Sequence, residues 1–197
     1  MIRHGQSEAD ISNVHEGRAD FPLTELGIRQ ARAMALWMAG EYALDRVYAS
    51  TLKRAAQTAQ ALADTCGLPV HWEDGLMERD NGLLAGLSKE EANRLYPPAP
   101  NMPIHRELYG KEPLLDFRCR AERVLSKILE ESLDLAAIAV VSHGGMINQL
   151  WHCLLRLPTE SGLAFPTADT GIHGFRITEK GRSVLFANNT SHLFEIK

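Results

Sequence analysis

Met1-Ile2-Arg3-His4-Gly5-Gln6-Ser7-Glu8-Ala9-Asp10 opens the chain, and the position of its Arg-His-Gly tripeptide decides the fold. This tripeptide follows what the sequence indicates is the end of a strand. A second His-Gly lies far downstream, where an apolar run at residues 137–142 ends in His143-Gly144-Gly145 before a helical segment. Both places predict the order strand, His-Gly, helix. Ligands of open α/β sheets bind outside the carboxyl ends of the strands, and helix N–H groups attract anions, so we expect both histidines to face one phosphate.

The residue types at this place have a chemical reason. Imidazole is a nucleophile at neutral pH, and a glycine beside it permits a close backbone approach. The guanidinium of Arg3 is a permanently charged, forked donor for phosphoryl oxygens. One tripeptide is weak evidence. Taken singly, His4 and His143 also fit the reading in which each histidine merely ends a strand and hydrogen bonds only to the backbone.

Bulk composition indicates one ordinary globular domain. The 197 residues are 45% hydrophobic and 23% charged, and the net charge of −4 argues against a nucleic-acid partner. The three cysteines are odd in number and lack a Cys-x-x-Cys pair, which favours reduced thiols. No apolar run approaches the roughly 20 residues of a membrane span, and no signal peptide precedes Arg3. We therefore expect a cytoplasmic protein without a membrane partner.

Helices and strands alternate along the chain. Thr24 is the expected N-cap of a helix that ends at Gly40, and residues 47–49 are a short strand. Ser50 is then expected to cap a helix that closes at Gly67 and carries Arg54 in its first turn. Further elements are a strand at 70–72, a loop at 76–82, a helix from 114 to 129 and a closing hairpin at 172–187. This order predicts a three-layer α/β/α sandwich with a mainly parallel central sheet.

One irregular stretch interrupts the alternation. A short helix is expected from Ser88, and five prolines lie between Pro97 and Pro113. Because long irregular loops in a compact domain are usually functional, we interpret residues 88–113 as a cap or lid over the site within a single domain of residues 1–197.

Five motifs together resemble the histidine phosphatase superfamily, the phosphoglycerate mutase-like group, in its phosphatase branch. They follow the family's order over most of the chain and read Arg3-His4-Gly5, Asp20-x-Pro22-Leu23-Thr24-x-x-Gly27-x-x-Gln30-Ala31, Ser50-x-Leu52-x-Arg54-Ala55-x-Gln57-Thr58-Ala59, Glu78-x-x-x-Gly82-x-x-x-Gly86 and Ser142-His143-Gly144-Gly145. The resemblance implies a phosphoglycerate mutase-like fold. It also implies that no cofactor and no metal is needed.

The resemblance also assigns residue roles. It implies that His4 is the nucleophile, phosphorylated transiently, and that Arg3, Arg54 and His143 clamp the phosphoryl oxygens. Glu78 matches the family's general acid and base. The substrate-binding residues expected on this basis are Arg3, Asp10, Glu16, Gly17, Arg54, Glu78, His143 and Gly144.

Two positions depart from the family's pattern. Asp10 and Glu16 stand where amides are common, and an ionised carboxylate only accepts hydrogen bonds. Three readings are open for this pair: the carboxylates bind a cationic or hydroxyl-bearing part of the substrate, pair with Arg3 or Arg54, or point away from the site.

The leading hypothesis is a phosphomonoesterase that hydrolyses a small-molecule phosphate ester through a phosphohistidine at His4. Its nearest rival is a phosphoglycerate mutase, which the chain length disfavours, and a non-catalytic phospho-ligand module is disfavoured because all five catalytic residues are present. A metallohydrolase built from His4, Asp10, Glu78 and His143 would leave Arg3 beside the cation, which is electrostatically poor. Sugar phosphates, ribazole phosphate, phosphoserine and phosphoprotein are open as substrates, and the sequence allows a homodimer.

Overall fold

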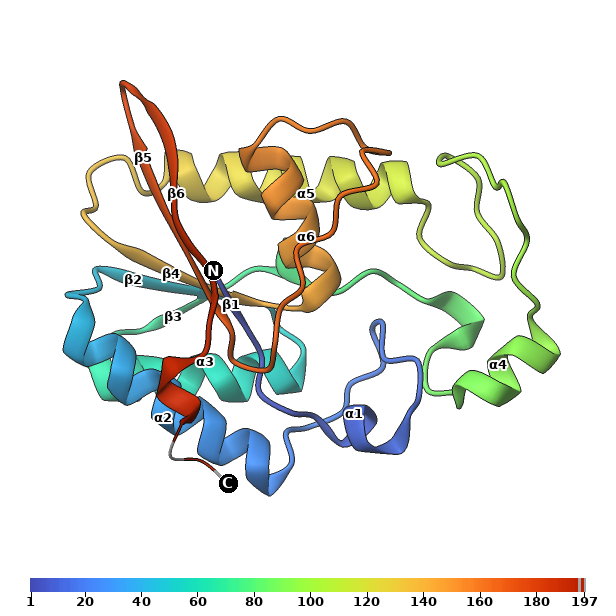
Figure 1. Cartoon of the computed structure of the whole chain (residues 1–197), viewed down its shortest axis with the longest axis horizontal. Helices are drawn as coiled ribbons and strands as arrows, with labels where there is room; N and C mark the ends of the chain where they lie inside the picture. The colour runs from blue at the N-terminus through green and yellow to red at the C-terminus, as the bar shows by residue number, and fades with distance from the viewer. Residues whose placement is uncertain (195, 197) are drawn as a thin grey trace.

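A six-stranded sheet runs through the centre of the computed structural model, which describes residues 1–194 and 196 (Figure 1). The strands are β1 (Ile2–Arg3), β2 (Arg46–Ala49), β3 (Val70–Trp72), β4 (Ile138–Ser142), β5 (Ile172–Thr178) and β6 (Gly181–Asn189). The helices are α1 (Glu8–Ser12), α2 (Glu25–Glu41), α3 (Lys53–Cys66), α4 (Lys89–Leu95), α5 (Leu114–Glu130) and α6 (Gly144–Leu154), with short 3-10 turns η1 (Asp74–Leu76), η2 (Gly82–Leu84) and η3 (Ser191–Leu193).

The strand order is β3-β2-β4-β1-β5-β6, and its first four strands are parallel. Strands β5 and β6 form the predicted closing hairpin and join antiparallel to β1. In the pairing of β1 with β4, Arg3 lies opposite Ser142, and the N–H of His4 donates to the Ser142 carbonyl at 3.0 Å. This register sets His4 and His143 side by side at the carboxyl edge of the sheet.

Helices cover both faces of the sheet, so the predicted three-layer sandwich is confirmed. Helices α2 and α3 lie on one face and α5 and α6 on the other (Figure 1). Successive strand residues point to opposite faces. Accordingly, Val47 of β2 packs with the α2 and α3 side chains, whereas its neighbour Tyr48 packs with those of α5 and α6.

Caps explain where the helices begin and end. The Thr24 hydroxyl accepts from the N–H of Gly27 to start α2, and Gly67 ends α3 in the left-handed conformation, both as predicted. The prediction that Ser50 caps α3 is wrong. That helix begins at Lys53 with no side-chain cap, because Ser50 is still bonded to the sheet through its N–H and directs its hydroxyl to His143.

The first His-Gly also differs from the expected pattern. Helix α1 begins only at Glu8, capped by Ser7, so three residues separate it from His4. At the second His-Gly the helix follows directly, with His143 in the N-cap position of α6. Among residues 1–194 and 196, no helix is both long and apolar enough to cross a bilayer.

Candidate active site

His4 is held as a neutral imidazole whose electron pair on Nε2 accepts a hydrogen bond from Arg54. Its Nδ1 lies 2.8 Å from the Gly5 carbonyl oxygen, and its Nε2 lies 3.2 Å from Nε of Arg54. Because a guanidinium only donates, Nε2 is the acceptor and the ring proton is on Nδ1. Burial, followed by the charges of Arg54 and Arg3, lowers the pKa of His4 well below its usual value. An unprotonated Nε2 is the form of histidine that can attack an electrophile.

Gly5 allows the chain to pass close to the start of α2. A methyl group on Gly5 would lie 2.6 Å from the Gly27 carbonyl oxygen, and the N–H of Gly5 donates to the Thr58 hydroxyl at 3.1 Å. Any larger residue would push His4 away from α3, where Arg54 lies. This confirms the close backbone approach that we expected beside the first histidine.

His143 lies against His4, with ring centroids 5.1 Å apart, and is fully buried. Its Nε2 is 2.8 Å from the Ser50 hydroxyl, and within the described chain its buried Nδ1 has no hydrogen-bond partner. Burial, Arg54 and His4 lower its pKa well below the usual value. A neutral His143 that accepts from Ser50 at Nε2 carries its proton on Nδ1, where it is free to donate to a ligand.

Arg3 carries a second buried donor, Nε, that no other described residue uses, in addition to Nδ1 of His143. Its Nη1 donates to the Thr167 carbonyl at 2.9 Å and lies 3.3 Å from Oδ1 of Asp169, and its Nη2 donates to Asp10 at 3.1 Å. Its Nε is buried and unpaired among the residues that the structure describes. A Cβ on Gly144 would lie 3.9 Å from that Nε, so the first turn of α6 is adjacent. Two unpaired donors beside a helix N-terminus are suited to an anion.

Arg54 is completely buried, and all of its donor nitrogens are used. Besides Nε, its Nη2 donates to the Gly17 carbonyl at 2.9 Å and its Nη1 to the Ala19 carbonyl at 3.0 Å. Gly17 therefore reaches the site through its backbone. Its positive φ of 52° is one that a side chain disfavours.

The carboxylates of Asp10 and Glu16 both lie in the site and pair with its arginines. Asp10 contacts Arg3, and Oε2 of Glu16 lies 3.5 Å from Nε of Arg54 and 3.9 Å from Nε2 of His4. Of the three readings that the sequence left open, pairing with the arginines is the one that the structure shows.

Glu78 reaches the site from the loop after η1. Its Oε2 accepts from the N–H of Gly145 at 2.8 Å, so the carboxylate lies on the N-terminus of α6, next to His143. A methyl group on Gly145 would overlap with this carboxylate. Arg120 fixes the loop by donating to the backbone carbonyls of Met77 and Glu78 at 2.6 and 3.1 Å.

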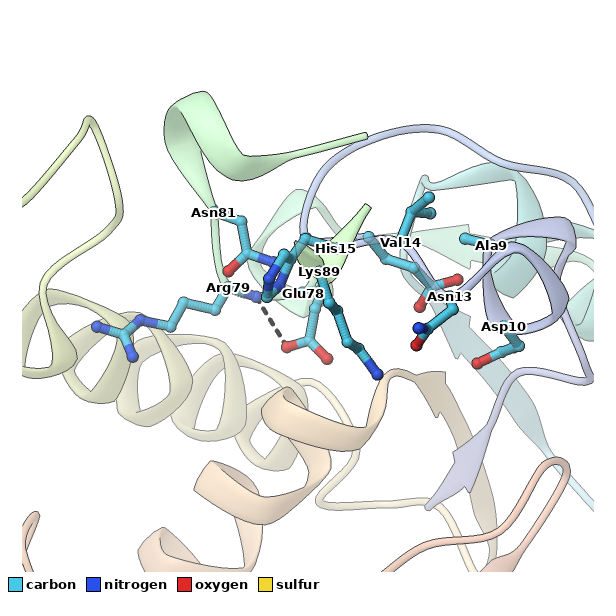
Figure 2. A pocket seen from close by; sticks show the side chains of 11 residues that line it. Ala9, Asp10, Asn13, Val14, His15, Glu78, Arg79, Asn81 and Lys89 are labelled. Atoms are coloured by element: carbon cyan, nitrogen blue, oxygen red, sulfur yellow. Dashed lines mark hydrogen bonds between the residues drawn. The ribbon is translucent and has the colours of Figure 1, made fainter. Parts of the chain in front are cut away.

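A cavity of about 350 Å³ opens beside these groups, and its lining is mostly polar (Figure 2). It is lined by Ala9, Asp10, Asn13, Val14, His15, Glu16, Gly17, Glu78, Arg79, Asn81 and Lys89. Lys89 comes from α4, at the start of the segment 88–113 that we interpret as a cap. In Figure 2 its side chain extends toward the space between Glu78 and Asp10, whereas the Arg79 side chain points away. No set of three or more potential metal-binding side chains occurs among residues 1–194 and 196.

Three contributors to the site were not foreseen. Ser50 was assigned to a helix cap, Ser7 bridges Asp10 and Glu16, and Asp169 reaches Arg3 from the loop before β5. Ser7 and Asp10 have the spacing of a capping box, which was a usable signal. Nothing in the sequence near Asp169 connects it with Arg3.

The fold and the site define an α/β protein in which two buried histidines, His4 and His143, lie together with Arg3 and Arg54 at the carboxyl edge of the sheet. The model of the histidine phosphatase superfamily (branch 1) matches residues 1–190, and the chain belongs to this family. The relatives that the chain resembles include phosphatases and phosphoglycerate mutases.

Named relatives include both activities. A 2,3-bisphosphoglycerate-dependent phosphoglycerate mutase from Sinorhizobium fredii is 34% identical, over 87% of this chain and 85% of the mutase. Phosphoserine phosphatase 1 from Hydrogenobacter thermophilus is 28% identical, over 99% of this chain and 93% of the phosphatase. Among solved structures, a putative alpha-ribazole-5'-P phosphatase from Escherichia coli superposes with a TM-score of 0.86 at 26% identity, over 96% of this chain and 94% of that one.

Proposed function

We propose that the protein is a phosphomonoesterase that works through a phosphohistidine at Nε2 of His4. The observation that carries this proposal is the hydrogen bond from Nε of Arg54 to that nitrogen, which assigns the ring proton to Nδ1. Attack of this electron pair on phosphorus would displace the hydrogen bond and leave Nε of Arg54 to donate to a phosphoryl oxygen. Cationic stabilisation of a transferring phosphoryl group contributes about 10³ to 10⁵ in rate.

The first step forms a bond from Nε2 of His4 to phosphorus and breaks the ester bond, whose oxygen leaves with a proton from Glu78. The unpaired Nε of Arg3 and Nδ1 of His143 would donate to the phosphoryl oxygens. In the second step the Glu78 carboxylate takes a proton from water, which attacks phosphorus and frees His4. The position of Glu78 beside Gly145 suits both steps, because it borders the cavity as well as α6.

A phosphoglycerate mutase is the second candidate, and the 34% identity to the Sinorhizobium fredii mutase favours it. The alignment covers 85% of that mutase. Chain length therefore separates a phosphatase from a mutase less well than the sequence alone indicated. The charges in the cavity support hydrolysis. Its lining carries three carboxylates, of Asp10, Glu16 and Glu78, against the cations Arg79 and Lys89, and the Arg79 side chain points away. This lining opposes a bisphosphorylated acid, with two phosphates and a carboxylate, more strongly than a singly phosphorylated ester. A singly phosphorylated, small and polar ester fits better, with segment 88–113 as its proposed cover.

The test measures phosphate release from an aryl phosphate in excess EDTA. Wild type is compared with His4→Ala and with His71→Ala, which removes an exposed histidine of β3 as a matched control. The proposal expects activity that survives the chelator, is unchanged in the control and is lost in His4→Ala. If the phosphoryl group of phosphoglycerate moves from one carbon to the other faster than phosphate is released, the mutase is favoured instead.

A further inference from the structure

The loop that carries Glu78 is joined to the end of segment 88–113. The N–H of Glu112 donates to the Asp80 carbonyl at 3.0 Å, and the N–H of Asp80 donates to Oε2 of Glu112 at 3.2 Å. Nε of Arg79 donates to the Glu112 carbonyl at 2.8 Å. Glu112 therefore holds both of the residues that directly follow Glu78.

The backbones of the two segments also approach each other closely. The N–H of Leu83 donates to the Tyr109 carbonyl at 2.9 Å. Gly82 lies against Tyr109 and Gly110, and a Cβ at position 82 would be 2.3 Å from the Tyr109 carbonyl oxygen. Because no side chain fits between them, the loop and the end of the segment form one packed unit.

Arg120 of α5 fixes this unit to the rest of the domain. Its Nε and Nη2 donate to the two carboxylate oxygens of Glu112 at 2.9 and 2.7 Å. Its Nη groups also donate to the carbonyls of Gly75, Met77 and Glu78. Burial raises the pKa of Glu112, but the hydrogen bonds and the charge of Arg120 outweigh burial, so the pKa is below its ordinary value. Glu112 is therefore ionised at neutral pH and forms a bidentate pair with Arg120.

The position of the loop decides where the Glu78 carboxylate lies. Its Oε1 accepts from the N–H of Arg79 at 2.8 Å, and its Oε2 accepts from the N–H of Gly145 at 2.8 Å. One donor belongs to the loop and the other to α6, so a shift of the loop relative to α6 would turn or detach the carboxylate. Glu112 is not one of the described residues that line the cavity. It acts on Glu78 through the backbone of Arg79 and Asp80.

We propose that Glu112 is a positioning residue, which holds this loop so that the carboxyl group of Glu78 meets the leaving oxygen of the ester. The inference rests on the proposed function, in which Glu78 protonates that oxygen. A positioned proton donor contributes roughly 10²- to 10⁴-fold in rate, and a displacement of about 1 Å can cost about 10²-fold. The loss depends on the ester, because an alkoxide needs a proton to leave and a phenolate needs it much less.

The test measures kcat/KM for an alkyl and an aryl phosphate in wild type, Glu112→Gln and Glu122→Gln. Glutamine keeps the shape of Glu112 but loses one of the two oxygens that accept from Arg120. Glu122 is the matched control, because it pairs with a different arginine of α5, Arg118, at 2.9 Å. Both esters are assayed on one preparation, so unfolded protein cancels in the alkyl-to-aryl ratio. We expect Glu112→Gln to lower this ratio about tenfold and Glu122→Gln to leave it unchanged. An unchanged ratio in Glu112→Gln overturns the inference.

A second background separates positioning from a merely structural role. Glu112→Gln is combined with Glu78→Gln, in which no proton donor remains to be displaced. The ratio should then be the same with and without Glu112→Gln, and a further tenfold fall would overturn the inference. If Glu78→Gln alone keeps the wild-type ratio, the proposed function fails at its proton donor. If Glu78→Gln lowers the ratio and Glu112→Gln does not, only the inference fails.

A third variant keeps the test available if Glu112→Gln does not fold. Arg79→Met removes the 2.8 Å bond to the Glu112 carbonyl and leaves the carboxylate of Glu112 on Arg120. A lowered alkyl-to-aryl ratio in Arg79→Met supports the link between Glu112 and the proton donor, and an unchanged ratio overturns it.

Discussion

Replacing Ser50 with alanine tests how the site controls the tautomer of His143. Both residues are completely buried, and their hydrogen bond of 2.8 Å is the contact that holds Nε2 of this ring. Alanine removes the hydroxyl and leaves a buried ring nitrogen without a partner, which costs about 1–3 kcal/mol. If the full cost is expressed in the transition state, kcat/KM falls about 5- to 150-fold, since about 1.4 kcal/mol corresponds to a tenfold change. The unfolding free energy should fall by a similar amount.

The assay is kcat/KM for an aryl phosphate at pH 7, with urea unfolding of the same preparations. Ser142→Ala is the matched control, because it removes another fully buried serine hydroxyl whose 2.7 Å bond goes to the Leu76 carbonyl and not to a histidine. We expect both variants to lose comparable stability, whereas Ser50→Ala loses much more activity. A Ser50→Ala enzyme within twofold of wild type would refute the argument that Ser50 directs the Nδ1 proton of His143 toward the substrate.

Three further predictions concern stability and the proton donor. Gly145→Ala should push Glu78 away and reduce hydrolysis of alkyl phosphates about tenfold more than that of aryl phosphates, whose better leaving group needs less protonation; equal losses on the two ester classes would contradict this. Burial lowers the pKa of His173 to about 4. The unfolded chain therefore binds a proton below about pH 6.5 that the folded protein does not bind. This one histidine should lower stability by up to about 1.4 kcal/mol per pH unit from 6.5 to 4, and the lowered pKa values of His4 and His143 add to the loss. Urea titrations across this range check it, and a curve that does not fall on acidification would contradict it. Arg120→Ala breaks a part-buried bidentate pair with Glu112 and should cost about 3–5 kcal/mol in urea unfolding, whereas a loss below 1 kcal/mol would show that the pair is dispensable.

Local patterns were enough to predict most of the fold. The apolar run before His143, the cap at Thr24 and the glycine at 67 each act within a few residues, so a single sequence reveals them. The register of β1 on β4 follows from the same reasoning, because two parallel strands that end in His-Gly bring their histidines together. Of the site residues named from the sequence, Asp10, Glu16, Gly17 and Glu78 line the cavity. His4, Arg3, Arg54 and His143 lie beside it in contact with these residues or with one another, and their roles stay predictions.

Long-range polar contacts could not be predicted in this way. The partner of His143 is 93 residues away at Ser50, and the local preference of serine for helix caps pointed to a different role. Asp169 reaches Arg3 across an even longer separation, and no pattern in its own segment marks it.

The central claim is that His4 carries the phosphoryl group during turnover. The most direct measurement is rapid quenching of the enzyme with a ³²P-labelled phosphate ester, followed by peptide mapping. A label that survives base, is lost in acid, lies on the peptide containing His4 and is absent from His4→Ala is the predicted result. Turnover without any label at His4, or an unchanged label in His4→Ala, would contradict the account.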